Sequence, residues 1–153
     1  MPRWADLFAR ILRGDAPPPP VATLVGMELV SVAPDRAVFT MDAGPQHGNP
    51  FGRVQGGLLC TLADAAMGTA YVSGLRDDES MTTLEVKMNF LRPVRRGRLT
   101  AVAEVIKRGQ RVGLVECTVT DEQGRMVARA SSTCLTLRAG EEGGGAAGEE
   151  AGG

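Results

Sequence analysis

One apolar stretch in the middle of the chain restricts the possible folds more than any other feature. Residues 57–72 consist mostly of Leu, Ala, Met, Thr and Gly, and Asp64 is their single carboxylate. This composition predicts a helix that is buried on most of its sides. An ionised Asp inside such a helix costs several kcal/mol unless it is paired or faces a cleft. The fold therefore has to surround the helix and still give Asp64 a polar partner or an opening.

Helical geometry divides the residues of this stretch into two sides. At about 100° per residue, one side carries Asp64 with the neighbours Gly57, Cys60, Thr61, Gly68 and Tyr71, and the other carries Leu58, Leu59, Leu62, Ala66 and Ala70. The two glycines would let a ligand or another backbone approach closely. Asp64 is therefore the first candidate for chemistry, although the spacing alone equally allows a structural acid bonded to Thr61 or to a neighbouring chain.

The start of this helix offers a second candidate feature. A polar, glycine-bearing loop from His47 leads into it. The first N–H groups of a helix have no partner within it, so those of residues 55–57 form a potential anion site at the positive end of the helix dipole. A carboxylate two turns beyond an oxyanion-binding helix terminus is suited to acyl transfer.

The composition indicates one soluble globular domain without a basic or acidic bias. The chain has 153 residues, of which 43% are hydrophobic, and 17 Lys and Arg against 18 Asp and Glu leave a net charge of -1. This balance argues against a nucleic-acid partner. Two short basic clusters, at residues 92–98 and 107–111, are interpreted as solvated surface, with contact to a phosphate-rich ligand as the alternative.

Cysteine and histidine usage excludes several kinds of site. Cys60, Cys117 and Cys134 lie far apart in apolar segments without metal-ligand spacing, so we interpret them as buried, reduced thiols and expect no metal. His47 is the single histidine and no serine lies in a nucleophile elbow, which argues against a Ser-His-Asp triad. No signal peptide and no run of roughly 20 apolar residues is present, so we expect a cytoplasmic protein without a membrane partner.

The ends of the chain differ in pattern from its centre. Apolar residues at helical spacing predict an amphipathic helix over residues 3–13, which Gly14 and the prolines at 17–20 end in an extended, stiff connector. Residues 139–153 are almost only Gly, Ala and Glu, and we expect this tail to be disordered. These signals divide the chain into an N-terminal helix and connector at 1–21, a domain at 22–138 and the tail at 139–153.

Within the domain, period-two alternation predicts strands before and after the helix. Two strands at 24–33 and 36–42, joined at Pro34-Asp35, precede the helix at 56–73. Apolar residues at 82, 84, 86, 88 and 90 alternate with polar ones as a half-buried strand, and strands at about 98–107, 111–121 and 125–137 follow, with turns at Gly109 and 121–124. The order predicts an α+β hotdog fold, in which an antiparallel sheet wraps around one long central helix.

Two segments carry a resemblance to a known family. HGNPFGRVQGGLLCTLADAAMGTA at 47–70 and TTLEVKMNFLRPVRRGRL at 82–99 resemble the acyl-CoA thioesterases of the phenylacetic-acid-degradation type, also called PaaI-like. The resemblance covers residues 22–137. It implies sites that lie between subunits, and hence a homodimer that commonly assembles further into a homotetramer.

The resemblance also implies roles for particular residues. Asn49 corresponds to the family residue that orients the thioester or the attacking water, and Gly56 to the helix-start glycine whose N–H polarises the thioester carbonyl. Asp64 corresponds to the helix carboxylate that acts as general base or nucleophile. Thr83 matches a hydroxyl residue supplied by the facing subunit. We expect the parity of its strand to group Thr83 with Glu85 and Lys87, away from the helix, so that it reaches a site only through a partner chain.

One position departs from the family pattern. The family usually has His-Gly-Gly at the helix start, whereas this chain has Gln55-Gly56-Gly57. Gln keeps hydrogen-bonding capacity but cannot change its charge near neutral pH. Gln55 and Gly57 are candidate substrate-binding residues, as is His47, for which a structural role in capping the turn is favoured over a place in the pocket.

These inferences lead to one expected function and two alternatives. We expect hydrolysis of an acyl- or aryl-CoA thioester without a metal or redox cofactor, CoA being part of the substrate. The main alternative is a non-catalytic acyl-CoA-binding or sensing module that has lost turnover through Gln55. A hotdog dehydratase is the weaker alternative, because it pairs a helix carboxylate with a catalytic His and only His47 is available. The sequence does not reveal the acyl group.

Overall fold

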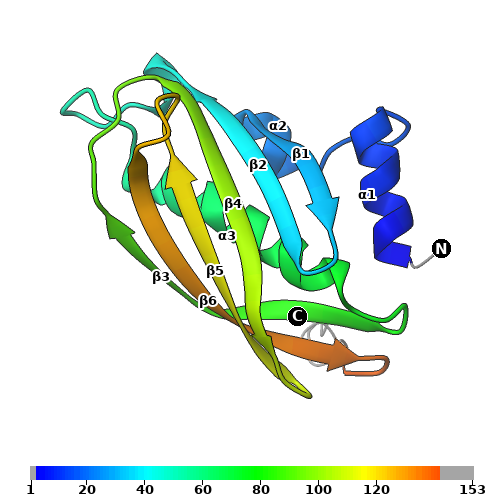
Figure 1. The fold of residues 1–153 in the computed structure, drawn as a ribbon. Coiled ribbons are helices and arrows are strands. Elements are labelled where there is room, and N and C mark those ends of the chain that lie inside the picture. Colours follow the sequence, from blue (N-terminus) through cyan, green and yellow to red (C-terminus); the bar gives the residue numbers. More distant parts are fainter. Residues whose placement is uncertain (1–2, 142–153) are drawn as a thin grey trace, which may run out of the picture.

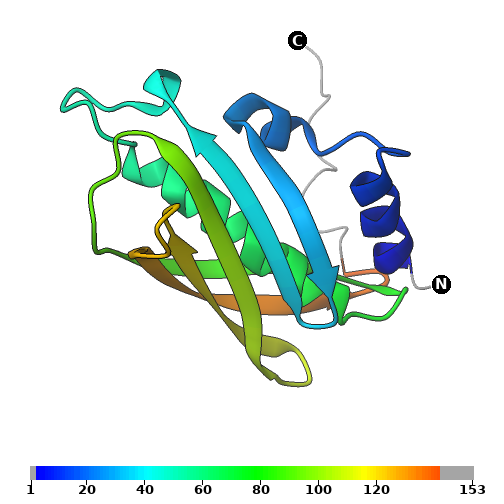
Figure 2. The same ribbon diagram turned by 45° about the horizontal axis from the view of Figure 1, so that its top comes forward.

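A single curved sheet wraps around one long helix. The structure, a computed structural model, describes residues 3–141. Its six antiparallel strands follow the order β1-β2-β4-β5-β6-β3, and they cross the central helix α3, Gly56–Ser73, obliquely (Figure 1 and Figure 2). This is the α+β arrangement that the sequence predicts, and the helix has the predicted bounds.

Most strands lie within a few residues of their predicted positions. The strands are β1 (Met27–Ala33), β2 (Arg36–Ala43), β3 (Glu79–Phe90), β4 (Gly97–Arg108), β5 (Val112–Thr120) and β6 (Met126–Arg138). The predicted turn between β1 and β2 is present, with Asp35 at φ 61, a left-handed conformation that Asp tolerates better than most residues.

The predicted strand at 24–33 is wrong in its first part. Residues Pro20–Val25 form a short helix, α2, and β1 begins only at Met27. Pro20 is the first helical residue, where its missing N–H is harmless. Gly26 then ends the helix in the left-handed conformation, with its N–H donating to the Ala22 carbonyl (2.8 Å). The stiff connector is correspondingly shorter than predicted.

The predicted N-terminal helix is confirmed as α1, Arg3–Arg13. It lies beside β1 (Figure 1), and its apolar side is only half-buried. The Trp4 indole N–H donates to the Glu79 carbonyl at the start of β3 (3.0 Å). This bond ties the helix to a segment that is far away in the sequence.

The core lies between α3 and the concave face of the sheet. The buried residues of α3 are Leu59, Leu62, Ala63, Ala66, Met67, Ala70 and Tyr71. The sheet faces them with small residues, among them Ala101, Ala103 and Ala130. Cys117 and Cys134 are buried free thiols and Cys60 is half-buried; burial raises the pKa of Cys117 to about 12, which keeps it protonated.

Tyr71 was expected beside Asp64 but lies in the core. Its side chain is 0% exposed, and its hydroxyl shares a hydrogen bond with that of Thr136 on β6 (2.8 Å). Gly113 on β5 makes room, since a Cβ there would lie 2.3 Å from the Tyr71 ring. Tyr71 and Asp64 were expected on the same side of α3. The sheet covers this side at Tyr71, near the end of the helix, but leaves it partly exposed at Asp64.

The end of the chain is described only in part. The Ala139 N–H donates to the Asp78 carbonyl (3.1 Å), and Glu141 pairs with Arg111. Residues 142–153, the rest of the predicted tail, lie outside the described residues. Of the described helices, none combines the length and apolar character needed to cross a membrane.

The Tyr71–Thr136 bond anchors α3 and can be tested by a double-mutant cycle. Tyr71→Phe and Thr136→Val should each lower the free energy of unfolding by about 1–3 kcal/mol, because each leaves one buried hydroxyl unpaired. The double variant should lose less than the sum of the two, since no unpaired group remains. Urea unfolding of the four proteins checks this; strict additivity would show that the hydrogen bond is unimportant.

Candidate active site

The loop before α3 is braced by His47. Its Nδ1 accepts the Gly44 N–H (3.0 Å), its Nε2–H donates to the Val25 carbonyl (2.7 Å), and its backbone carbonyl accepts the Gln55 N–H (2.9 Å). The residue is 5% exposed. Both ring nitrogens are therefore used within the chain, which agrees with the structural role and leaves neither for a ligand.

Asn49 shapes the tip of the same loop. Its Oδ1 accepts the N–H groups of Phe51 (2.9 Å) and Arg53 (3.2 Å), and its own N–H donates to the Arg53 carbonyl (2.7 Å). Gly52 sits in this turn at φ 68, in the left-handed region. Because the side-chain oxygen is committed to the turn, the Nδ2 amide is the group that Asn49 can offer to a substrate.

An open cavity of about 390 Å³ lies between this loop and the start of α3. The Val54 N–H donates to the Val94 carbonyl (2.8 Å) and joins the loop to the segment between β3 and β4. Arginines and apolar side chains share the lining, which consists of Asn49, Arg53, Val54, Gly56, Leu59, Phe90, Leu91, Arg92, Pro93 and Val94. Phe90 and Arg53 were not among the site residues predicted from the sequence, and Arg92 belongs to a cluster that was interpreted as solvated surface, with contact to a phosphate-rich ligand as the alternative.

Gly56 brings a backbone donor to this cavity. It is the first residue of α3, where the N–H has no partner within the helix. A Cβ at this position would lie 3.0 Å from the Phe90 ring, so glycine keeps the approach open. The expected anion site is smaller than predicted, because the Gln55 N–H already donates to His47. The Gln55 side chain is exposed and makes no cap hydrogen bond.

Asp64 lies half-buried on α3 and has a partner in its own chain. The Thr83 hydroxyl donates to Asp64 Oδ1 (3.2 Å). Thr61 does not fill this role, since its hydroxyl donates to the Gly57 carbonyl (3.0 Å). The structure thus brings together two residues that the resemblance assigns to the site, and it does so without a second subunit.

The parity expected for Thr83 was wrong because β3 contains a bulge. Thr83 pairs with Cys134 of β6, but Glu85 pairs with Thr133, so Leu84 is an extra residue in β3. The bulge reverses the alternation. Thr83, which precedes the bulge, and Met88, which follows it, both contact side chains of α3. Leu84, the extra residue, is 55% exposed.

Cys60 lies four residues before Asp64 on α3 and is not an activated nucleophile. Burial, and to a lesser extent the negative charge of Asp64, raises the pKa of the Cys60 thiol. Its Sγ contacts the Met88 sulfur (3.6 Å). A protonated thiol is a weak nucleophile, so Asp64 remains the candidate for chemistry on this side of the helix.

The two halves of the candidate site are separated along the helix. Asp64 follows Gly56 by eight residues, which corresponds to about 12 Å of helix rise. One carbonyl group therefore cannot contact the Gly56 N–H and the Asp64 carboxylate of the same chain. The side of α3 that carries Gly57 and Gly68 is open among the described residues, because a Cβ on either glycine would have no atom within 4 Å.

Comparison with known proteins gives consistent matches. Residues 51–128 match the model of the thioesterase superfamily. The 1,4-dihydroxy-2-naphthoyl-CoA hydrolase of Listeria monocytogenes is 31% identical over 67% of this chain and 84% of its own. Acyl-coenzyme A thioesterase 13 of Mus musculus is 25% identical over 69% of this chain and 76% of its own.

Solved structures agree with these matches. A phenylacetic acid degradation-related protein from Ralstonia eutropha superposes with a TM-score of 0.76 at 34% identity, covering 84% of this chain and 98% of its own. A point mutant of the phenylacetic acid degradation protein PaaI from Thermus thermophilus gives a TM-score of 0.73 at 27% identity, covering 78% of this chain and 100% of its own.

Among residues 3–141, no three His, Cys, Asp or Glu side chains are grouped to hold a metal ion.

Proposed function

This chain belongs to the thioesterase superfamily, and we propose that it hydrolyses an acyl- or aryl-CoA thioester to the free acid and CoA. The observation that carries the proposal is that one helix holds a Thr83-bound carboxylate and, where it begins at the cavity, an N–H without a partner within the helix. The superfamily match and the CoA thioesters named for two relatives supply the substrate class.

The chemistry needs two functions, which these groups supply. Asp64 either takes a proton from the attacking water or attacks the carbonyl carbon itself, while the Gly56 N–H stabilises the negative charge that develops on the carbonyl oxygen. The C–S bond then breaks, and the CoA thiolate leaves and takes up a proton. In the route in which Asp64 attacks, water then hydrolyses the acyl–Asp64 anhydride, which releases the free acid and restores the carboxylate. Thr83 donates to Asp64 Oδ1, and no other group of residues 3–141 forms a hydrogen bond with this carboxylate. Asn49 lines the cavity, and in this proposal its amide orients the thioester or the water.

The helix geometry supports a site shared by two subunits. A two-fold axis that sets two α3 helices antiparallel near Cys60 brings Gly56 of one subunit to the Asp64 of the other. Gly57 and Gly68 would permit close approach on this side. The strand β3 lies at an edge of the sheet, where its unpaired backbone groups can bond to a second copy. We propose a homodimer as the active unit, with a dimer of dimers as the larger assembly.

The alternatives fit the geometry less well. A hotdog dehydratase needs a catalytic His, but both ring nitrogens of His47 bond to backbone groups. A non-catalytic acyl-CoA-binding module would retain the cavity but would not need the Thr83–Asp64 pair. Thiol release over a panel of aryl, short-chain and long-chain acyl-CoA substrates separates the enzyme from the binding module.

The first prediction concerns the carboxylate. Asp64→Asn is nearly isosteric and should leave the fold intact, yet it should lower kcat by at least about a hundredfold, because the base or nucleophile is lost. Glu28→Gln removes an exposed carboxylate from β1 and serves as the control with unchanged kcat. Wild-type thiol release from folded Asp64→Asn protein would disprove the assignment.

The second prediction isolates the Gly56 N–H. Gly56→Pro removes the N–H at a helix position that suits proline, and Gln55 at φ -62 and ψ 129 already has a conformation allowed before proline. It should lower kcat by about 100-fold to 1,000-fold. Gly56→Ala is the control, because it adds a Cβ at the same place, adjacent to Phe90, and keeps the N–H.

Mixed dimers test whether the site is shared. Co-expression of Asp64→Asn and Gly56→Pro chains with different tags yields heterodimers in which one site combines the intact Gly56 of one chain with the intact Asp64 of the other. Purified heterodimers should recover about half of the wild-type activity. Heterodimers as inactive as both parents would place the two groups of a site in one chain.

A further prediction addresses Gln55. Gln55→His should keep kcat/KM within about tenfold of wild type if the position only donates or accepts a hydrogen bond, whereas Gln55→Ala should cost about 1–3 kcal/mol of transition-state stabilisation. Rates and CoA affinities of the three proteins check this. A wild type that binds acyl-CoA without turnover, and gains turnover on Gln55→His, would favour the binding module.

A further inference from the structure

The arginines of this chain fall into two groups. Eight of them lie within 4 Å of a carboxylate, namely Arg13, Arg36, Arg76, Arg98, Arg108, Arg111, Arg125 and Arg129. Within residues 3–141, the other seven arginines have no carboxylate within this distance, namely Arg3, Arg10, Arg53, Arg92, Arg95, Arg96 and Arg138. Of these, Arg53 and Arg92 line the 390 Å³ cavity, and Arg95 follows Arg92 in the same segment, where Arg98 by contrast is held by Asp42 through two bonds of 2.8 Å.

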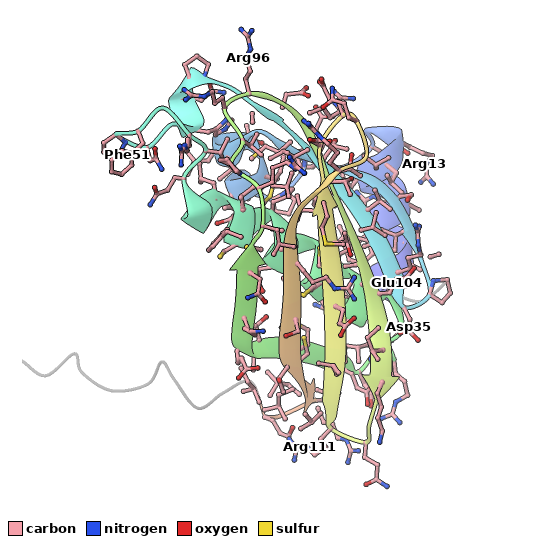
Figure 3. All side chains as sticks on the ribbon, turned by 60° about the vertical axis from the view of Figure 1, so that its left-hand side comes forward. Arg13, Asp35, Phe51, Arg96, Glu104 and Arg111 are labelled. Carbon is pink, nitrogen blue, oxygen red and sulfur yellow. The ribbon has the colours of Figure 1, made fainter. Side chains whose placement is uncertain are left out.

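Backbone contacts fix these three arginines close together. Arg53 and Arg92 line the cavity from two different segments. The Val54–Val94 hydrogen bond joins those segments and sets Arg53 and Arg95 on adjacent backbone. The Arg95 guanidinium reaches across, with Nη1 3.5 Å from the position of a Cβ on Gly52. Arg96 is not part of this group, since it projects outward at the end of the molecule (Figure 3).

The positive charge of these three arginines indicates what kind of ligand they can bind. Arg53 and Arg92 line the same cavity as Gly56 at the positive end of α3, and Arg95 lies at the adjacent Gly52 turn. These groups concentrate positive charge there, although the chain as a whole has a net charge of -1. Guanidinium groups bind phosphate oxygens through paired, charge-assisted hydrogen bonds. A ligand with several phosphate groups therefore matches the mouth of the cavity, and the acyl part of a thioester offers no such group.

We propose that Arg53, Arg92 and Arg95 bind the phosphate groups of the CoA nucleotide and make the enzyme selective for CoA over thiols without a nucleotide. This inference rests on the proposed thioesterase function. It gives the short basic cluster of the sequence a second role besides solvated surface. The cavity then has two binding positions. The arginines bind the phosphates, and the Gly56 N–H binds the thioester carbonyl.

Kinetics with one acyl group on three thiols tests the proposal. The substrates are the thioesters of CoA, 3′-dephospho-CoA and pantetheine, and the variants are Arg53→Gln, Arg92→Gln, Arg95→Gln and the triple substitution. For acyl-CoA, each single variant should raise KM about fivefold to tenfold and the triple variant about a hundredfold, with kcat within about threefold. For acyl-pantetheine, KM and kcat should stay unchanged.

Two controls sharpen the comparison. Arg10→Gln removes an exposed, unpaired arginine from α1 and should leave KM for acyl-CoA unchanged. Raising the salt concentration should increase the wild-type KM for acyl-CoA more than that of the triple variant, because screening acts on the lost charges. Equal increases in KM for acyl-CoA and acyl-pantetheine, or none, would overturn the proposal.

Failure of this inference is distinguishable from failure of the proposed function. Binding of CoA itself, measured by calorimetry, should weaken about a hundredfold in the triple variant whether or not turnover occurs. Asp64-dependent turnover combined with unchanged CoA binding refutes only the phosphate site. Hydrolysis of an acyl group on a carrier protein in preference to acyl-CoA, lost in the triple variant, would overturn the CoA assignment in favour of a protein-bound phosphopantetheine.

Discussion

The burial of α3 is the constraint on which the rest of the structure depends. The sheet covers Leu59, Leu62 and Met67 almost completely, but it leaves a side of small residues around Asp64 open in the first half of the helix. A sheet that covered this side too would bury a carboxylate, which is costly even when it is hydrogen-bonded. One subunit therefore folds around most of the helix and leaves the reactive part to a substrate or to a second copy.

The loop before α3 turns this open side into a site with a defined position. His47 fixes the loop through two ring hydrogen bonds, and the Val54–Val94 bond joins it to the segment after β3. The backbone thus holds Gly56 and the cavity arginines in place, while Asp64 is held separately by Thr83. Positioning that comes from such contacts does not depend on a bound ligand.

Local sequence signals predicted the elements well where local chemistry decides them. The bounds of α3 follow from the glycines at its start and the apolar run behind them, and the turn at Asp35 follows from Pro34-Asp35. The helix α2 was missed although Pro20 and Gly26 are local signals. The other errors arose where tertiary pairing decides. The bulge at Leu84 reverses the side that Thr83 faces, and Gly113 admits Tyr71 into the core. Neither the bulge nor the space at Gly113 leaves a periodic signal in the sequence. The resemblance therefore supplied Asp64 and Thr83 as site residues, and the structure showed that they are paired within one chain.

The C-terminal end of α3 is neutralised by a cation of the same chain, whereas its N-terminal end has no side-chain cap. This difference explains where an anion can bind. At the C-terminal end, Arg108 donates to the Tyr71 carbonyl (2.7 Å), stacks on the Tyr71 ring and pairs with Asp35. The fold thereby satisfies the negative end of the helix dipole with its own cation. At the N-terminal end Gln55 gives no side-chain cap, and the nearby arginines Arg53 and Arg92 add positive charge without a carboxylate among the described residues. The positive end of the helix therefore stays available for an anion, which in the proposed function is the charge that develops on the thioester carbonyl.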